Sequence, residues 1–189
     1  MNTWMKGLLL AIGMFGMTAH AQAITINVEK KDVGPGQAPH LIELYGDIKE
    51  GDGAKFARVI KEKKITKAVV SLDFDGDLTT PALEIANIIR DKGFTTYVGS
   101  GNECHGMCSI VWLSGGGTRY VGRASIIAFH EGNEQITKHL IKVGVSPETI
   151  KTILSPPEDD FILNAENAPK LGISFTLWDK EDTFINFNN

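Results

Sequence analysis

The segment Gly101–His130 (GNECHGMCSIVWLSGGGTRYVGRASIIAFH) decides the fold, because a turn, a helix and a buried strand follow one another closely in it. The run Ser109–Ser114 is apolar and stops at three glycines, which predicts a short helix and a loop. The β-branched run Ser125–Phe129 predicts a buried strand that aims His130 at the turn. A sharp strand-to-helix turn leaves backbone N–H groups free to hold an anion, as in the nucleophile turns of hydrolases. The apex residue, however, is Gly106, which carries no nucleophile.

Upstream of this segment, strand-like and helix-like patterns alternate along the chain. Short apolar runs followed by helical periodicity predict βαβ units and a mostly parallel sheet in an α/β fold. The expected elements are strands at Ile24–Val28, His40–Tyr45, Ala68–Asp73, Phe94–Val98 and Ile173–Trp178, helices at Gly53–Lys64, from a cap at Thr79 or Thr80 to Lys92, at Gln135–Val143 and at Ser146–Leu154, and a loop at Glu29–Pro39.

The first residues have the pattern of a secretory signal peptide. Lys6 precedes the apolar run Gly7–Met17, which is too short to span a bilayer. Ala19-His20-Ala21 is an A-x-A cleavage site, with Ala21-Gln22-Ala23 as the alternative. We therefore expect a signal peptide at residues 1–21, a single domain at 24–189, and a periplasmic or secreted protein without a membrane span.

The composition fits one globular domain with a real core. The chain has 189 residues, is 42% hydrophobic and carries a formal charge of −4 at pH 7. This acidic balance, without a basic patch, argues against nucleic acid as a partner. His40 and His139 are isolated in the sequence, and we expect both on the surface.

Cys104 and Cys108 are the only cysteines, and they flank the apex of the turn. In an oxidising compartment two thiols this close can pair, and the alternative is two buried thiols. Cys104, His105, Cys108 and His130 can also be drawn as a zinc set. These residues are equally ordinary in a turn, so we expect neither a metal nor a cofactor.

The acidic loop Asp73–Asp77, with Thr79 and Glu84, mimics the ligand positions of a calcium loop. Leu78 stands where that loop needs glycine for its turn, and a strand precedes the loop instead of a helix. An acidic surface loop is the simpler interpretation, and a calcium-binding module remains an alternative.

From His40 to Phe175 the chain resembles the Clp protease proteolytic subunit and the wider ClpP/crotonase superfamily. Its flanking cysteines resemble those of exported bacterial Clp-like proteins, which carry Cys-x-Ser-x-Cys at the turn. The resemblance implies a ClpP/crotonase-like spiral of repeated βαβ units. The matching segments are Leu41–Ile48, Leu72–Ile89, Cys104–Gly115, Arg119–His130 and Glu158–Gly172.

Residue by residue, the resemblance places the family's catalytic histidine on His130 and its aspartate on Asp160, with Asp159 as the alternative. The nucleophilic serine falls on Gly106. One donor of the oxyanion hole falls on the N–H of Met107. The other, a glycine in the family, falls on Asp77, whose carboxylate would repel an oxyanion.

These departures predict an exported Clp-like protein with a degenerate serine-protease site and a non-catalytic role in binding or assembly. The resemblance implies a homo-oligomer and an unknown protein or peptide partner. One alternative is a residual hydrolase that uses His130 and Asp160 with a displaced nucleophile, Cys104, Cys108 or Ser109. A crotonase-like reaction on a thioester would need the same oxyanion hole. The carboxylate of Asp77 therefore disfavours this reaction too.

Overall fold

The computed structural model describes residues 23–33, 38–156 and 160–178. The predicted signal peptide and Asp159 lie outside the described residues. Within those ranges, no helix combines the length and the apolar character that crossing a bilayer requires.

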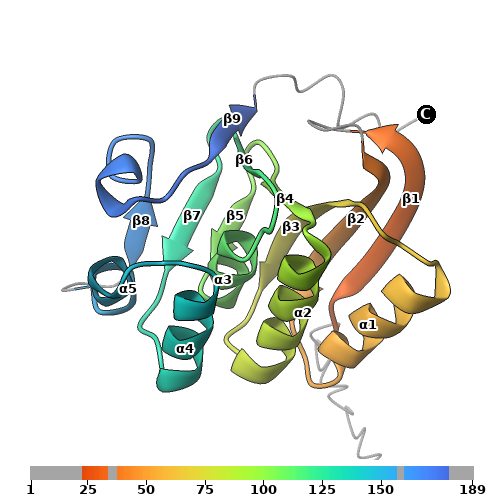
Figure 1. Ribbon diagram of the computed structural model, residues 1–189, viewed down its shortest axis with the longest axis horizontal. Helices are drawn as coiled ribbons and strands as arrows, with labels where there is room; N and C mark the ends of the chain where they lie inside the picture. The colour runs from red at the N-terminus through yellow and green to blue at the C-terminus, as the bar shows by residue number, and fades with distance from the viewer. Residues whose placement is uncertain (1–22, 34–37, 157–159, 179–189) are drawn as a thin grey trace, which may run out of the picture.

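A six-stranded sheet forms the larger layer of the molecule (Figure 1). Its strands run in the order β1-β2-β3-β4-β6-β9, and all neighbours are parallel except the hairpin β1–β2. Leu44, Leu72 and Val98 stand side by side in register and are completely buried. The strands are β1 Thr25–Val33, β2 Ala38–Asp47, β3 Val69–Asp75, β4 Thr95–Val98, β6 Arg119–Gly122 and β9 Thr176–Trp178.

A second sheet has three strands, and the first of them leads into the turn at Gly106. It contains β5 (Glu103–His105), β7 (Ile126–Phe129) and β8 (Phe161–Leu163). Strand β5 runs parallel to β7, and β8 runs antiparallel to β7. The end of β5, the end of β7 and the start of β8 therefore lie at the same end of the small sheet.

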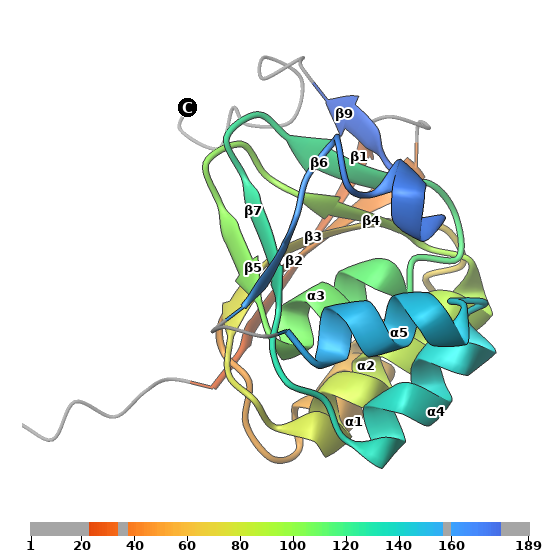
Figure 2. The same cartoon turned by 90° about the vertical axis from the view of Figure 1, so that its left-hand side faces the viewer.

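Five α-helices pack on one side of the larger sheet (Figure 2). Helix α3 lies in the angle between the two sheets, and each of its residues is buried because apolar neighbours surround it. Trp112 of α3 donates from Nε1 to the Tyr120 carbonyl at 3.2 Å and packs edge-on against Phe175. The helices are α1 Asp52–Glu62, α2 Thr79–Lys92, α3 Met107–Leu113, α4 Glu134–Lys142 and α5 Pro147–Leu154, with a 3-10 turn η1 at Pro169–Leu171.

The expected α/β class with a mostly parallel sheet is confirmed, but three local predictions are wrong. The expected loop Glu29–Pro39 belongs largely to the β1–β2 hairpin, because polar residues are tolerated on an edge strand. No threonine caps α2: Leu78 is its N-cap, and the Thr79 hydroxyl instead accepts a hydrogen bond from Asn133. Strand β6, placed in a glycine-rich loop by the sequence, pairs with β4.

Candidate functional site

The apex of the turn joins β5 to α3 at Gly106. This residue has φ 54° and ψ −117°, a conformation that glycine adopts without steric cost. Its N–H donates to the Ala128 carbonyl of β7 at 3.0 Å, which ties the apex to the strand that His130 follows. The predicted sharp strand-to-helix turn is therefore present.

The two cysteines form a disulfide that brackets the apex. Because the two sulfurs are bonded to each other, the turn offers no free thiol. Both cysteines are also fully buried. Ser109 is also fully buried, and its hydroxyl donates to the Gly106 carbonyl at 2.7 Å. None of the three displaced nucleophiles proposed from the sequence is thus available to attack a bound substrate.

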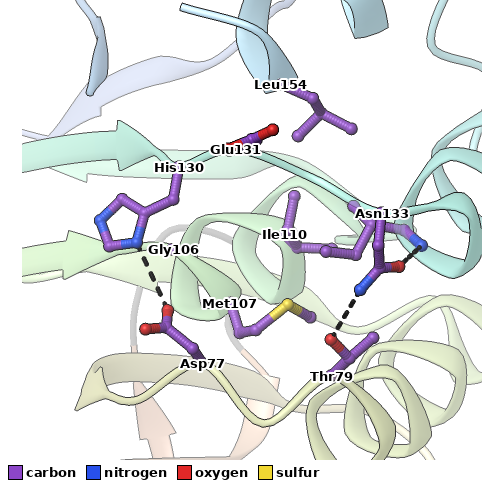
Figure 3. Close-up of a pocket in the computed structure, with 10 residues that line it drawn as sticks. Asp77, Thr79, Gly106, Met107, Ile110, His130, Glu131, Asn133 and Leu154 are labelled. Carbon is purple, nitrogen blue, oxygen red and sulfur yellow. Dashed lines mark hydrogen bonds and ion pairs between the residues drawn. The ribbon is translucent and has the colours of Figure 1, made fainter. Parts of the chain in front are cut away.

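His130 stands between the carboxylates of Asp77 and Asp160. Figure 3 shows its contact with Asp77 beside Gly106. Its Nδ1 lies 3.4 Å from Asp77 Oδ1, and its Nε2 lies 3.3 Å from Asp160 Oδ1. The structure thus brings together four of the residues that the resemblance aligned with a catalytic site: His130, Asp160, Gly106 and Asp77.

A side chain at Gly106 would meet the ends of the His130 and Asp77 side chains. A Cβ built on Gly106 would lie 2.8 Å from His130 Nδ1 and 2.8 Å from Asp77 Oδ1. Atoms at these distances clash, so a serine here would force the His130–Asp77 pair to move. In a serine hydrolase the same space holds the hydroxyl that donates to the histidine.

The two positions predicted for an oxyanion hole, Met107 and Asp77, have different surroundings. Met107 is the first residue of α3, where N–H groups have no acceptor within the helix. On the opposite side, the family's glycine is replaced by Asp77, whose carboxylate faces the apex. A negative charge this close would destabilise a developing oxyanion.

A pocket of about 310 Å³ opens beside the apex (Figure 3). Its apolar lining comes from Met107, Ile110, Ile136 and Leu154, and its polar lining comes from Asp77, Thr79, His130, Glu131 and Asn133. Asn133 donates to the Thr79 hydroxyl at 3.1 Å and so ties the start of α4 to the start of α2. The pocket can take an apolar side chain whose backbone stays at the polar rim.

His105 also lies at this site, where it approaches Asp160, a contact that the sequence did not predict. His105 Nδ1 lies 3.7 Å from Asp160 Oδ2, and its ring centroid is 6.1 Å from that of His130. Asp160 therefore faces two histidines. From the sequence, His105 was grouped with His130 and the two cysteines, and not with Asp160.

His139 lies in the core, so the prediction of a surface histidine is wrong. It shares the buried face of α4 with Ile136 and Leu140, at the spacing expected for one side of a helix. Burial, followed by the positive charges of Arg90 and Lys142, lowers its pKa to about 4. Ser114 Oγ lies 2.6 Å from its Nε2.

The acidic loop does not have the form of a calcium loop. Asp73 and Asp75 belong to strand β3, and Asp75 accepts a hydrogen bond from the N–H of Gly76. Asp77 turns instead toward His130. Among the described residues, the carboxylates of this loop do not gather around a common point.

No protein-family model matches this chain, and no curated protein matches it. Solved structures do match. ClpP1 from Listeria monocytogenes, studied as a mutant, aligns with a TM-score of 0.54 and 15% identity over 75% of this chain and 92% of its own. The 1510-N membrane protease specific for a stomatin homolog from Pyrococcus horikoshii aligns with a TM-score of 0.54 and 14% identity over 72% and 71%.

Methylmalonyl CoA decarboxylase, solved with 2S-carboxypropyl CoA, aligns with a TM-score of 0.57 and 8% identity over 87% of this chain and 72% of its own. Identities this low show the fold alone. The chain therefore has the ClpP/crotonase-like fold that the resemblance implied, a fold shared by proteases and by methylmalonyl CoA decarboxylase.

Proposed function

We propose that this chain is an exported, catalytically inactive Clp-like protein that binds a protein or peptide partner in the pocket beside Gly106. The observation that carries the proposal is the His130–Asp77 pair, which occupies the space of the missing serine. The disulfide and the buried Ser109 remove the other nucleophiles at the turn. A partner can still bind, because the pocket does not depend on the nucleophile.

The form of the pocket favours a peptide as the partner. The apolar wall fits one side chain, while the rim offers the Thr79–Asn133 pair and the carboxylate of Glu131 to a backbone. Self-association, which the resemblance implies, belongs to the same proposal. Light scattering of the purified chain measures it directly.

Labelling with a fluorophosphonate in the presence of EDTA, read by intact mass, tests the loss of catalysis. The wild-type chain from Gln22 onward should remain unlabelled. Gly106→Ser should label poorly, because Asp77 and His130 crowd the new side chain. The double variant Gly106→Ser with Asp77→Gly, which relieves one clash and the repulsive charge, should label. Gly106→Ala with Asp77→Gly is the matched control without a hydroxyl.

Labelling of the wild type at any residue would contradict the proposal and would identify the true nucleophile. The proposed export has a separate test. Expression of the full chain in a Gram-negative bacterium should give a periplasmic product that begins at Gln22, or at Ile24 if the alternative site is cleaved. A product that keeps residues 1–21 and stays in the cytoplasm would contradict export.

The partner pocket is tested by selecting peptides from a displayed library against the wild-type chain. Binding of the selected peptides should fall in Leu154→Asp, which puts a charge into the apolar wall. It should be unchanged in Tyr45→Asp, a substitution at an exposed apolar residue of β2 away from the pocket. Equal binding by both variants would place the peptide elsewhere.

A further inference from the structure

We propose that His105, His130 and Asp160 form a binding site for a divalent transition-metal ion, with Zn²⁺ as the expected ion. Within the described residues, this is the one group of histidine, cysteine or carboxylate side chains whose ligand atoms converge. The ligand atoms all lie within 4.8 Å of one another. Two histidines and one carboxylate are a donor set that suits zinc.

The separations of these atoms are close to those of a metal site. In a tetrahedral zinc site with bonds of about 2.0–2.1 Å, neighbouring ligand atoms lie roughly 3.3 Å apart. Here His130 Nε2 lies 3.3 Å from Asp160 Oδ1, and His105 Nδ1 lies 3.7 Å from Asp160 Oδ2. Small side-chain rotations therefore suffice to bring all three groups onto one ion.

The second nitrogen of each histidine supports this assignment independently. Histidines that bind metals usually donate their other ring N–H to a carboxylate, which fixes the ring. His130 faces Asp77 with Nδ1 at 3.4 Å, and His105 faces Glu103 with Nε2 at 3.4 Å. His105 Nε2 is buried and lacks a hydrogen bond of good geometry, so a small movement of Glu103 would satisfy it. Both rings thus turn their remaining nitrogen toward Asp160.

The fold holds the three ligands on adjacent strands of the small sheet. His105 ends β5 and pairs with Ala128 of β7, His130 follows β7, and Asp160 precedes β8. Because β5, β7 and β8 are hydrogen-bonded neighbours, the backbone fixes the relative positions of the ligands. About a third of each ligand side chain is exposed, which leaves room for water on the ion.

The electrostatic surroundings attract a cation. Both histidines border a hollow of about 470 Å³ whose other walls carry carboxylates of β2, β3 and β5. Those carboxylates belong to Asp47, Asp73, Asp75 and Glu103. A concave surface lined with one sign of charge raises the local concentration of the opposite ion.

This site replaces the zinc set that the sequence suggested. The disulfide withdraws both cysteines, and Asp160 supplies the third ligand instead. In this site Asp77, which stands where the resemblance places a glycine, would hold the His130 ring in position. Metal binding does not depend on the proposed peptide pocket, and EDTA in the labelling experiment keeps the two tests separate.

Isothermal titration of Zn²⁺ into the EDTA-stripped, tag-free chain from Gln22 onward tests the site. We expect one ion per chain, bound in the micromolar range or tighter. His105→Ala and Asp160→Asn should each weaken binding by more than about a hundredfold, and Asp77→Asn and Glu103→Gln by about ten- to a hundredfold. His40→Ala, a histidine at the start of β2, should bind as the wild type does.

Circular dichroism in EDTA confirms that each variant is folded before titration. Titration with Co²⁺ adds a spectroscopic readout, since ligation by histidine gives visible absorption bands that both ligand variants should lose. Absence of saturable Zn²⁺ binding by the folded wild type would overturn the proposal. Binding that survives in His105→Ala and Asp160→Asn but falls in Asp75→Asn would place the cation in the acidic hollow and would also overturn it.

Discussion

The chain contains a serine–histidine pair, but it lies in the core, while the histidine of the surface pocket has no serine. In the core, the Ser114 hydroxyl donates its single proton to the Ile110 carbonyl at 2.7 Å. The Nε2 of His139, 2.6 Å away, must therefore be the donor to Ser114 Oγ. The direction is the reverse of that in a serine hydrolase, where the hydroxyl donates to the ring.

At the surface, His130 has the opposite surroundings. It is a third exposed, faces two carboxylates and borders two hollows. The comparison shows that the presence of a histidine, with or without a serine beside it, does not decide what the histidine does. Its burial and its charged neighbours decide that. Burial makes His139 a neutral structural donor, while His130 is reached by solvent and contacts carboxylates with both ring nitrogens.

Of the changes that separate the buried His139 from the exposed His130, acidification should have the largest effect on the free energy of unfolding. The pKa of His139 is about 4 in the folded chain and about 6.5 in the unfolded chain, so the unfolded state takes up this proton first as the pH falls. Between pH 6.5 and 4 the free energy of unfolding should drop by up to about 3 kcal/mol from this residue. Urea unfolding of the wild type and of His139→Gln over this range measures the difference, and equal pH dependences would contradict it.

Removal of the core hydroxyl should have the next largest effect. Ser114→Ala leaves the Nε2–H of His139 buried without an acceptor, which should cost about 1–3 kcal/mol of stability at pH 7. The double variant Ser114→Ala with His139→Leu removes both polar partners and should recover part of this loss. A double variant less stable than Ser114→Ala alone would show that the pair matters mainly for packing.

Removal of the surface histidine should have the smallest effect. His130→Ala, unfolded in EDTA, should lie within about 0.5 kcal/mol of the wild type, because part-exposed ion pairs contribute little. The same substitution should abolish any gain in melting temperature on addition of Zn²⁺, since bound ligand stabilises only the folded state that binds it. A large loss of stability in EDTA would assign His130 a structural role like that of His139.

Much of the layered fold was accessible from the sequence, because local patterns carry it. The apolar runs of β3 and β4, the apolar side of α2 and the glycines after α3 fixed those elements to within a few residues. Ser146 was correctly placed at the start of α5, where its side chain accepts from the Thr149 N–H. Strand β6 was missed because it is short and follows three glycines, so only its partner β4 reveals it.

The candidate site could be predicted from the sequence only in part. The resemblance aligned Gly106, His130 and Asp160, and the structure places them together. The approach of His105 to Asp160 depends on the pairing of β5, β7 and β8, which spans about sixty residues of chain and leaves no local signal. His139 could have been found, since Ile136 and Leu140 mark its face of the helix as buried.

The disulfide across the turn has a consequence for protein engineering. It closes a small ring around Gly106, and such a closure restricts the unfolded chain by roughly 2 kcal/mol. A side chain forced into the backbone conformation of Gly106 would cost on the order of 1–3 kcal/mol. Because the disulfide is present whichever residue stands at the apex, this strain should appear in full as a loss of stability relative to the wild type. An engineered nucleophile at this turn would therefore need a stabilising substitution elsewhere in the chain, as well as a smaller residue at position 77.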